Sequence, residues 1–579
     1  PPNCPDTELN VASMLMKFVR LLMIPTAFLL VAGAWIWWSY PSQVDMTSYV
    51  PSESLLYLEV NNLPRIAKGI VDTSKGLSIG AQLKSSPFRV TWIGRLARWT
   101  GIGTTEEVIL ARSQFAMVIL ALDATDDQPT LRIRPAAALL IETHTSQRRM
   151  RPAIEKQIEQ LARRVYAQVS IKRKNIDGIE FVEWVSQADG RSIVATFLDS
   201  LVIVGNDELA VQACVAARRG TRPSLASNKD LSAMRDRLRG DSAAAFGYVS
   251  SDGLGKLLAF AAPLYVDRLS TSSEAQRILA SLAGKLFQSA GWAAGFEGGR
   301  IEDRYFVSLP HDVASNLREA FAAGPTTTAN AIRFLPADTY SFTRYNLRDP
   351  LLAWRGLNKA LSSHVDILGA VMITPLLKAA LSPYGIDDPD TFLGAVGSEI
   401  VTVRLDEGST PSVLIVQPHD PAALQRLISK RLGAGVRREL VGGYEMLVSS
   451  DESDIAASFA DEELLIGPPA LVGRCLLARS QQSTLDSVSS YKLVSRNVPY
   501  PPPLAITYSR DLKSAQDFLS IISGRQVQPI SGTAASRPEI PYAVSATAFT
   551  DEGFEKRTNS TFGFFGTLAA QFDSQLSGK

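Results

Sequence analysis

Residue types that carry chemistry are sparse in this chain, and their spacing fits few reactions. Of the four histidines, His144 and His419 stand at the ends of two expected strands, each just before an expected helix. A histidine in such a place usually caps or packs the helix entrance, and a catalytic or ligand role is the alternative. The sequence has neither an HExxH motif nor paired cysteines, so it predicts no metal site.

A serine and a lysine are the other candidates for catalysis. Ser489 and Lys492 satisfy the SxxK spacing, but the companion KTG motif is missing and no GxSxG elbow occurs. The glycines at 101–103 and 253–255 lack the spacing of phosphate-binding loops. We therefore expect no catalytic residue and no cofactor, and we interpret the protein as not being an enzyme.

Charged residues form short runs. The acidic pairs at 106–107, 126–127 and 387–388 do not alternate as calcium ligands do, which indicates solvated turns. The basic runs at 148–151 and 172–174 are expected to cover solvent-facing surface, and docking of an acidic partner is the alternative. Cys214 and Cys475 lie on apolar helical faces, so we expect both to be buried.

One ordered set of landmarks occurs twice. Residues 50–54 and 335–339 share a phrase of an apolar residue, proline, any residue, an acid, and serine or threonine. Each phrase is followed by strands, a Gly-Ile pair before an acidic turn, an amphipathic helix, a hairpin, and a strand that ends in glycine. Such repetition indicates a duplicated unit. We expect the two units to superpose, with His144 on His419 and Gly205 on Gly467.

The elements of each unit follow from periodicity. Alternating and β-branched runs predict strands at 54–60, 114–122, 136–142, 179–185, 192–197, 201–205 and 243–249. Apolar residues at helical spacing predict helices at 152–169, 207–218 and 469–479, and another that begins with Asp420 as N-cap and Pro421 as first residue. This pattern predicts an α+β unit with a mostly antiparallel sheet and helices on one face.

The run at 21–38 contains no charged residue and predicts a transmembrane helix. At about 1.5 Å per residue, this run and its flanks can cross a hydrocarbon core of roughly 30 Å. Lys17 and Arg20 precede it and no basic residue follows until Arg65, which indicates a cytoplasmic N-terminus. A cleaved signal peptide is the alternative. The expected anchor residues are Leu21, Leu22, Ile24, Phe28, Leu29, Leu30, Val31, Trp35, Trp37 and Trp38.

Composition fits a large globular body. Hydrophobic residues make up 46% of the chain and charged residues 20%, which is enough to build sizeable cores. The 59 basic and 58 acidic side chains nearly cancel, so the net charge gives no general attraction to nucleic acid. Three cysteines are too few for a disulfide framework.

The arrangement resembles a family of exported, N-terminally anchored bacterial proteins that is known only as a domain of unknown function. The phrases that carry the resemblance are 50–54, 101–107 and 202–205, and again 335–339, 385–390 and 465–467. The resemblance covers most of residues 45–579. It implies an extracytoplasmic location and a fold, and it carries over no catalytic residue.

Together these observations predict a single N-terminal transmembrane helix followed by two homologous α+β repeats with mostly antiparallel sheets. The expected divisions are a cytoplasmic stub (1–20), the transmembrane helix (21–40), a first periplasmic repeat (45–323), a linker (324–333) and a second repeat (334–579). The favoured function is that of a membrane-anchored extracytoplasmic scaffold or binding protein, an accessory subunit that binds another membrane or envelope protein. A binder of an apolar small molecule or lipid, and an envelope hydrolase, are the alternatives.

Overall fold

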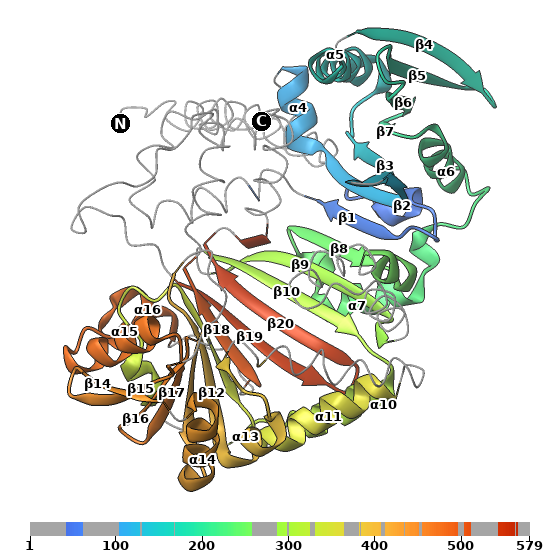
Figure 1. Ribbon diagram of the computed structural model, residues 1–579. Helices are drawn as coiled ribbons and strands as arrows, with labels where there is room; N and C mark the ends of the chain where they lie inside the picture. Colours follow the sequence, from blue (N-terminus) through green and yellow to red (C-terminus); the bar gives the residue numbers. More distant parts are fainter. Residues whose placement is uncertain are drawn as a thin grey trace, which may run out of the picture.

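The computed structural model describes residues 42–61, 66, 104–127, 130–166, 168–257, 286–297, 300–324, 330–363, 381, 384–406, 412–433, 435–450, 454–495, 503–510, 542–561 and 563–564 (Figure 1). Within this part of the chain, a single large sheet of 20 strands forms the body, and all of its strand pairs are antiparallel.

Ten strands come from the first half of the chain. They are β1 (Leu56–Val60), β2 (Gln114–Asp127), β3 (Thr130–Glu142), β4 (Val169–Ile176), β5 (Ile179–Ser186), β6 (Ser192–Leu198), β7 (Leu201–Gly205), β8 (Ala245–Val249), β9 (Ser289–Glu297) and β10 (Arg300–Ser308). Their pairings give the spatial order β4-β5-β6-β7-β3-β2-β1-β8-β9-β10.

The second half supplies the other ten strands in the same spatial order. They are β11 (Ser341–Asn346), β12 (Val396–Arg404), β13 (Val413–Pro418), β14 (Arg437–Val441), β15 (Tyr444–Val448), β16 (Ala456–Ala460), β17 (Glu463–Gly467), β18 (Ala505–Ser509), β19 (Ala543–Thr550) and β20 (Gly553–Ser560). Their order is β14-β15-β16-β17-β13-β12-β11-β18-β19-β20, so each strand of the first half has a counterpart at the same place.

The last strand of each half joins the two halves. β10 pairs with β20 (Figure 1), and in this pair Arg304 lies opposite Arg557. These two arginines occupy matching positions in their own hairpins, because Arg300 pairs with Glu297 as Gly553 pairs with Thr550. The halves are therefore related by an approximate two-fold axis through the Arg304–Arg557 pair, as in an isologous dimer interface.

Helices cover both faces of each half. In the first half they are η1 (Met46–Tyr49), α4 (Thr105–Arg112), α5 (Gln147–Val165), α6 (Glu208–Arg218), η5 (Leu225–Ser227), α7 (Lys229–Leu238), η6 (Gly240–Ser242) and α10 (His311–Ala320). In the second half they are η7 (Asn330–Phe334), α11 (Pro350–Ser362), α13 (Pro389–Ala395), α14 (Pro421–Leu432), α15 (Pro469–Ser480), η9 (Leu485–Ser487) and α16 (Ser489–Ser495).

Each half consequently has two apolar cores. In the first half, one core packs the sheet against α6, α7 and η1, and the other packs it against α4 and α5. In the second half the corresponding helices are α15, α16 and η7 on one face, and α11, α13 and α14 on the other. The strands require this cover, since β17 is buried at all of its positions and therefore presents apolar side chains on both faces. The expectation of helices on one face only is therefore wrong.

Local signals place several helices. Asp420 caps α14 by accepting a hydrogen bond from the Ala423 amide at 3.0 Å, and Pro421 is the first helical residue, as the sequence predicts. Arg218 lies over the ring of Tyr49 at 5.2 Å, and in the second half Arg479 lies over Phe334 at 5.9 Å. The same cation–π contact thus joins α6 to η1 in the first half and α15 to η7 in the second half.

The structure corrects the predicted fold class. The two α+β repeats do not have separate sheets, because β10 and β20 each have one open edge and pair with each other to make one mostly antiparallel sheet. Across the described ranges, no helix combines the length and the apolar character needed to cross a bilayer. The predicted transmembrane helix at 21–40 lies outside those ranges.

Candidate functional site

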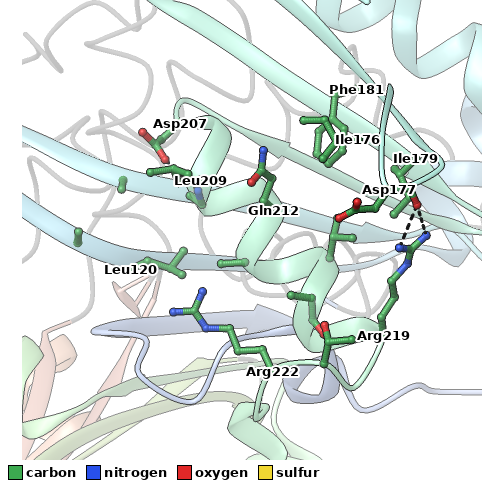
Figure 2. Close-up of a pocket in the computed structure, with 17 residues that line it drawn as sticks. Leu120, Ile176, Asp177, Ile179, Phe181, Asp207, Leu209, Gln212, Arg219 and Arg222 are labelled. Carbon is green, nitrogen blue, oxygen red and sulfur yellow. Dashed lines mark hydrogen bonds between the residues drawn. The ribbon is translucent and has the colours of Figure 1, made fainter. Parts of the chain in front are cut away.

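A groove lies beside α6 in the first half (Figure 2). The groove flanks α6 on two sides: the turn between β4 and β5 lines it on one side of the helix, and parts of β2 and β3 line it on the other. The groove has a volume of about 700 Å³, within the range of small-molecule and peptide sites. Its lining is apolar at Leu120, Ile176, Ile179, Phe181 and Leu209.

Charged residues stand at the two ends of the groove. Asp207 lies where α6 begins and caps it, accepting a hydrogen bond from the Ala210 amide at 2.9 Å. Arg219 and Arg222 follow the end of α6, and their side chains extend to opposite sides of the helix, Arg219 toward Asp177 and Arg222 toward Leu120 (Figure 2). Arg219 donates to the carbonyl oxygen of Asp177 from both terminal nitrogens, at 3.3 Å each, and Arg222 pairs with Glu53.

In the second half, the helix that corresponds to α6 packs differently. α15 packs against both β14 and β15, whereas α6 packs against β3, β6 and β7. The buried faces of the two helices match, with Val211, Cys214 and Val215 at the spacing of Val472, Cys475 and Leu476.

The same alignment also pairs the residues on the outward-facing sides of the two helices. Gln212 of α6 corresponds to Gly473 of α15, and Arg219 corresponds to Ser480. Small residues on α15 let the β14–β15 turn approach the helix, so a Cβ atom added to Gly442 would lie 2.6 Å from Ser480 Oγ. In the first half the longer side chains Gln212 and Arg219 occupy that space, and the groove stays open.

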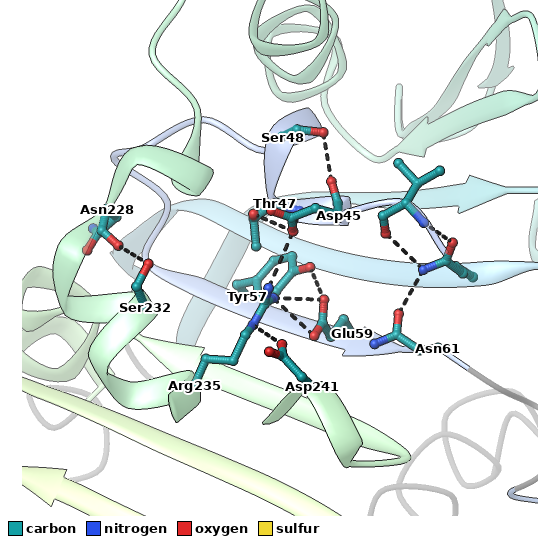
Figure 3. Close-up of polar contacts among 12 residues, drawn as sticks. Asp45, Thr47, Ser48, Tyr57, Glu59, Asn61, Asn228, Ser232, Arg235 and Asp241 are labelled. Carbon is teal, nitrogen blue, oxygen red and sulfur yellow. Dashed lines mark hydrogen bonds and ion pairs between the residues drawn. The ribbon is translucent and has the colours of Figure 1, made fainter. Parts of the chain in front are cut away.

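A second polar feature fixes the opening segment, residues 42–50, to the sheet (Figure 3). Arg235 of α7 donates to both carboxylate oxygens of Glu59, each at 3.1 Å, and to Asp45 at 3.4 Å. Tyr57 donates to Glu59 at 2.5 Å. Burial raises the pKa of Glu59, while Arg235 opposes that rise. Each of these side chains is bonded to Arg235 or to Glu59, so the cluster serves as a structural connection.

Gln114 completes this connection at the strand ends. Its amide nitrogen donates to the carbonyl of Val44 at 2.9 Å and to the Asn61 side chain at 3.0 Å, and its oxygen accepts from the Val44 amide at 2.8 Å. The His144 ring lies 3.0 Å from the same oxygen. His144 is therefore part of the packing of the opening segment, at a backbone φ of 49°.

The other candidate residues from the sequence lie apart from the groove. The backbone of His419 donates to the carbonyl of Ala395 at 2.9 Å, at the start of α14. Ser489 and Lys492 are exposed at the beginning of α16. Burial raises the pKa of the Cys214 and Cys475 thiols to about 12, which makes them poor nucleophiles.

The basic run at 172–174 is largely neutralised by neighbouring acids. Arg173 pairs with Glu155 and Glu180, and Lys174 pairs with Glu183 and Glu208. The expected anchor residues between Leu21 and Trp38 lie outside the described residues. In the part of the chain that the structure describes, no group of three histidine, cysteine or acidic side chains could hold a metal ion.

Sequence reasoning missed the groove, although part of its signal was present. When α6 is aligned with α15, Leu209 corresponds to Ala470 and Gln212 corresponds to Gly473. One face of α6 therefore carries larger side chains than the matching face of α15. That difference becomes interpretable only once the strands opposite the helix are known.

Comparisons with known proteins identify no relative. No family model matches the chain, no curated protein matches it, and no solved structure matches it. The resemblance to an exported family therefore stays a prediction, and the function has to be argued from the geometry of this chain.

Proposed function

We propose that this protein is a binding or scaffold protein that holds a partner protein in the groove beside α6. The observation that carries the proposal is the difference between the halves. They share the order of ten strands and the cation–π contact at the opening segment, yet the first half has an open apolar groove where α15 packs against its hairpin. A surface opened in only one of two matching units favours recognition over a purely structural role.

The partner is proposed to be another membrane or envelope protein, with this chain as an accessory subunit outside the cytoplasm. This part of the proposal depends on the composition of residues 1–41 and on the resemblance to an exported family. The groove itself requires only that the partner present an apolar segment.

A second candidate function is binding of an apolar small molecule or lipid. The volume of about 700 Å³ and the apolar lining favour it, because ligand sites commonly share both properties. The exposure of Leu209 favours a protein partner instead. Leu209 is 73% exposed at the rim of the groove, so it is accessible to a partner that is larger than the groove itself.

Site-specific photo-crosslinking in intact cells tests the proposal. A photoreactive amino acid in place of Leu209 should give a reproducible protein adduct, and the same substitution at Ala470, the exposed matching position on α15, should not. Filling the groove by Ala216→Trp should abolish the adduct, and Leu477→Trp at the matching position should leave it unchanged. No adduct from position 209, or one that survives Ala216→Trp, would contradict the proposal.

A further inference from the structure

We infer that β14 is a self-association edge, where a second copy of this chain pairs its own β14 antiparallel to the first and forms a symmetric dimer. This surface belongs to the second half and is separate from the groove beside α6, so the inference goes beyond the proposed function and does not depend on it. Three observations support it: β14 is an open edge, its backbone allows only certain registers, and one of these registers is complementary.

β14 and β4 are the two ends of the sheet (Figure 1). Among the described strands, β14 pairs only with β15, and β4 pairs only with β5. An open edge presents backbone donors and acceptors to other chains, and proteins usually protect it with like charges or proline. The basic run at 172–174 protects β4, because two copies of it would set like charges against each other. β14 has neither proline nor lysine, and its Leu440 is 78% exposed.

The hairpin turn determines which backbone groups of β14 point outward. Gly442 and Gly443 form a two-residue turn with φ angles of 60° and 88°, as in a type I′ turn. The closing pair Val441–Tyr444 therefore exchanges hydrogen bonds, and alternate residues along β14 do the same with β15. Leu440 and Arg438 lie between them and direct their backbone groups outward. A second strand has to align its own outward residues with these, so the allowed registers differ by steps of two residues.

One allowed register is complementary. When Arg438 lies opposite Arg438 of the second copy, Arg437 lies opposite Glu439, and the two-fold axis repeats this ion pair. Leu440 then lies opposite Val436, so its exposed side chain gains an apolar neighbour. Moving one strand by two residues would instead set Glu439 against Glu439, or Arg437 against Arg437, and like charges directly opposite each other are destabilising.

The central Arg438 pair is the unfavourable contact of this register, and the chain already contains a pair of this kind. At the β10–β20 junction Arg304 lies opposite Arg557, and each bonds to the acid two positions before it, at 2.6 Å. Arg438 has a comparable partner, because Glu445 on β15 lies 3.0 Å away. Two β14 edges can therefore meet around a pair of arginines, as β10 and β20 do.

Cysteine cross-linking of the full-length protein tests the register. The two described cysteines are buried, and Cys4→Ser removes the third. In this background Arg438→Cys should form a disulfide-linked dimer on mild oxidation, because Cα atoms in a hydrogen-bonded antiparallel pair are about 5.5 Å apart, within the range of a disulfide. Arg437→Cys and Glu439→Cys should cross-link far less, since neither residue lies opposite itself.

Charge reversal tests the complementarity. In sedimentation velocity, Arg437→Glu should raise the dissociation constant of the dimer about tenfold, because two attractive pairs become repulsive. Adding Glu439→Arg to the same chain should restore the wild-type value, and Lys172→Glu on the edge strand β4 should leave it unchanged. A monomeric wild type, cross-linking at 437 or 439 as strong as at 438, or failure of the double reversal to restore the dimer would overturn the inference.

Discussion

At the scale of single residues, the contact between the halves contains a buried charge. Asp303 of β10 is only 1% exposed and accepts hydrogen bonds from Trp292 Nε1 at 2.9 Å and from the Phe564 amide at 3.0 Å. The matching position in β20 is Lys556, since both lie one residue before the central Arg304–Arg557 pair. Burial raises the pKa of Asp303 to about 6 and lowers the pKa of Lys556, and the attraction between them opposes both shifts.

We predict that Asp303 makes stability depend on pH. Its pKa is higher in the folded protein than the ordinary value of 3.8, so its stabilising contribution is complete below about pH 4 and is lost as pH rises through about 6. This difference in pKa corresponds to roughly 3 kcal/mol. Urea unfolding from pH 4 to 7 should show the free energy of unfolding of wild type falling by about this amount relative to Asp303→Asn.

A constant difference between wild type and Asp303→Asn over this pH range would contradict the prediction. Any constant cost of the variant, such as a lost hydrogen bond to Trp292 or to the Phe564 amide, does not affect the comparison, because only the change with pH is read. The exposed variant Asp236→Asn, on α7, serves as a matched control and should unfold in parallel with wild type.

At the scale of elements, sequence patterns locate most strands of the first half but miss β4, β9 and β10. β5, β6 and β7 agree with the predicted runs to within one residue. β4 was not predicted, because its exposed side chains give it no apolar alternation. Its charges suit an edge strand, where they discourage pairing with other chains.

The contact between α15 and the β14–β15 turn gives a prediction at this scale. Gly442 and Gly443 both have positive φ, at 60° and 88°, but only a Cβ on Gly442 would meet the helix. Gly443→Ala should cost about 1 kcal/mol of backbone strain. Gly442→Ala should cost about 1–3 kcal/mol more, because it also forces the turn away from Ser480 and Leu476.

Chemical denaturation of the two glycine variants measures this difference directly. Equal destabilisation would mean that the turn does not depend on its close approach to α15. The open groove in the first half would then need a cause other than the longer side chains on α6.

At the scale of the whole molecule, the β10–β20 pair and the packing of α10 against α11 and β19 connect two halves that also have cores of their own. The clusters beneath α6 and α7 draw on first-half residues, and those beneath α15 and α16 draw on second-half residues. Ten strands is already large for a twisted open sheet. The sheet reaches 20 because the second half continues it across the two-fold axis.

Proline in the connecting strand should separate the two halves. Arg304→Pro removes a backbone donor from the centre of β10, between β9 and β20, and proline is poorly tolerated in an interior strand. We expect calorimetry to show two unfolding transitions in place of one, with the first-half transition at lower temperature. Glu439→Pro on the edge strand β14 is the control and should retain one transition. A single transition for Arg304→Pro would show that the packing of α10 against α11 and β19 is enough to couple the two halves.

The sequence by itself determined the local elements and their order. Alternation, caps and turn residues depend on neighbours a few positions away, so they placed the strands of the hairpins and the start of α14 at Asp420 and Pro421. The recurring landmarks also indicated that the two halves have related patterns. None of these signals specifies which strand edges meet.

Only the tertiary structure decided that β10 pairs with β20, because this contact joins residues about 250 positions apart and depends on which edges each half leaves open. It also decided the site. The groove beside α6 lies where Gln212 and Arg219 stand between the helix and the β4–β5 turn, at positions where Gly473 and Ser480 let α15 and the β14–β15 turn meet. The distance between the helix and the turn depends on packing across the sheet, and it cannot be derived from periodicity along the chain.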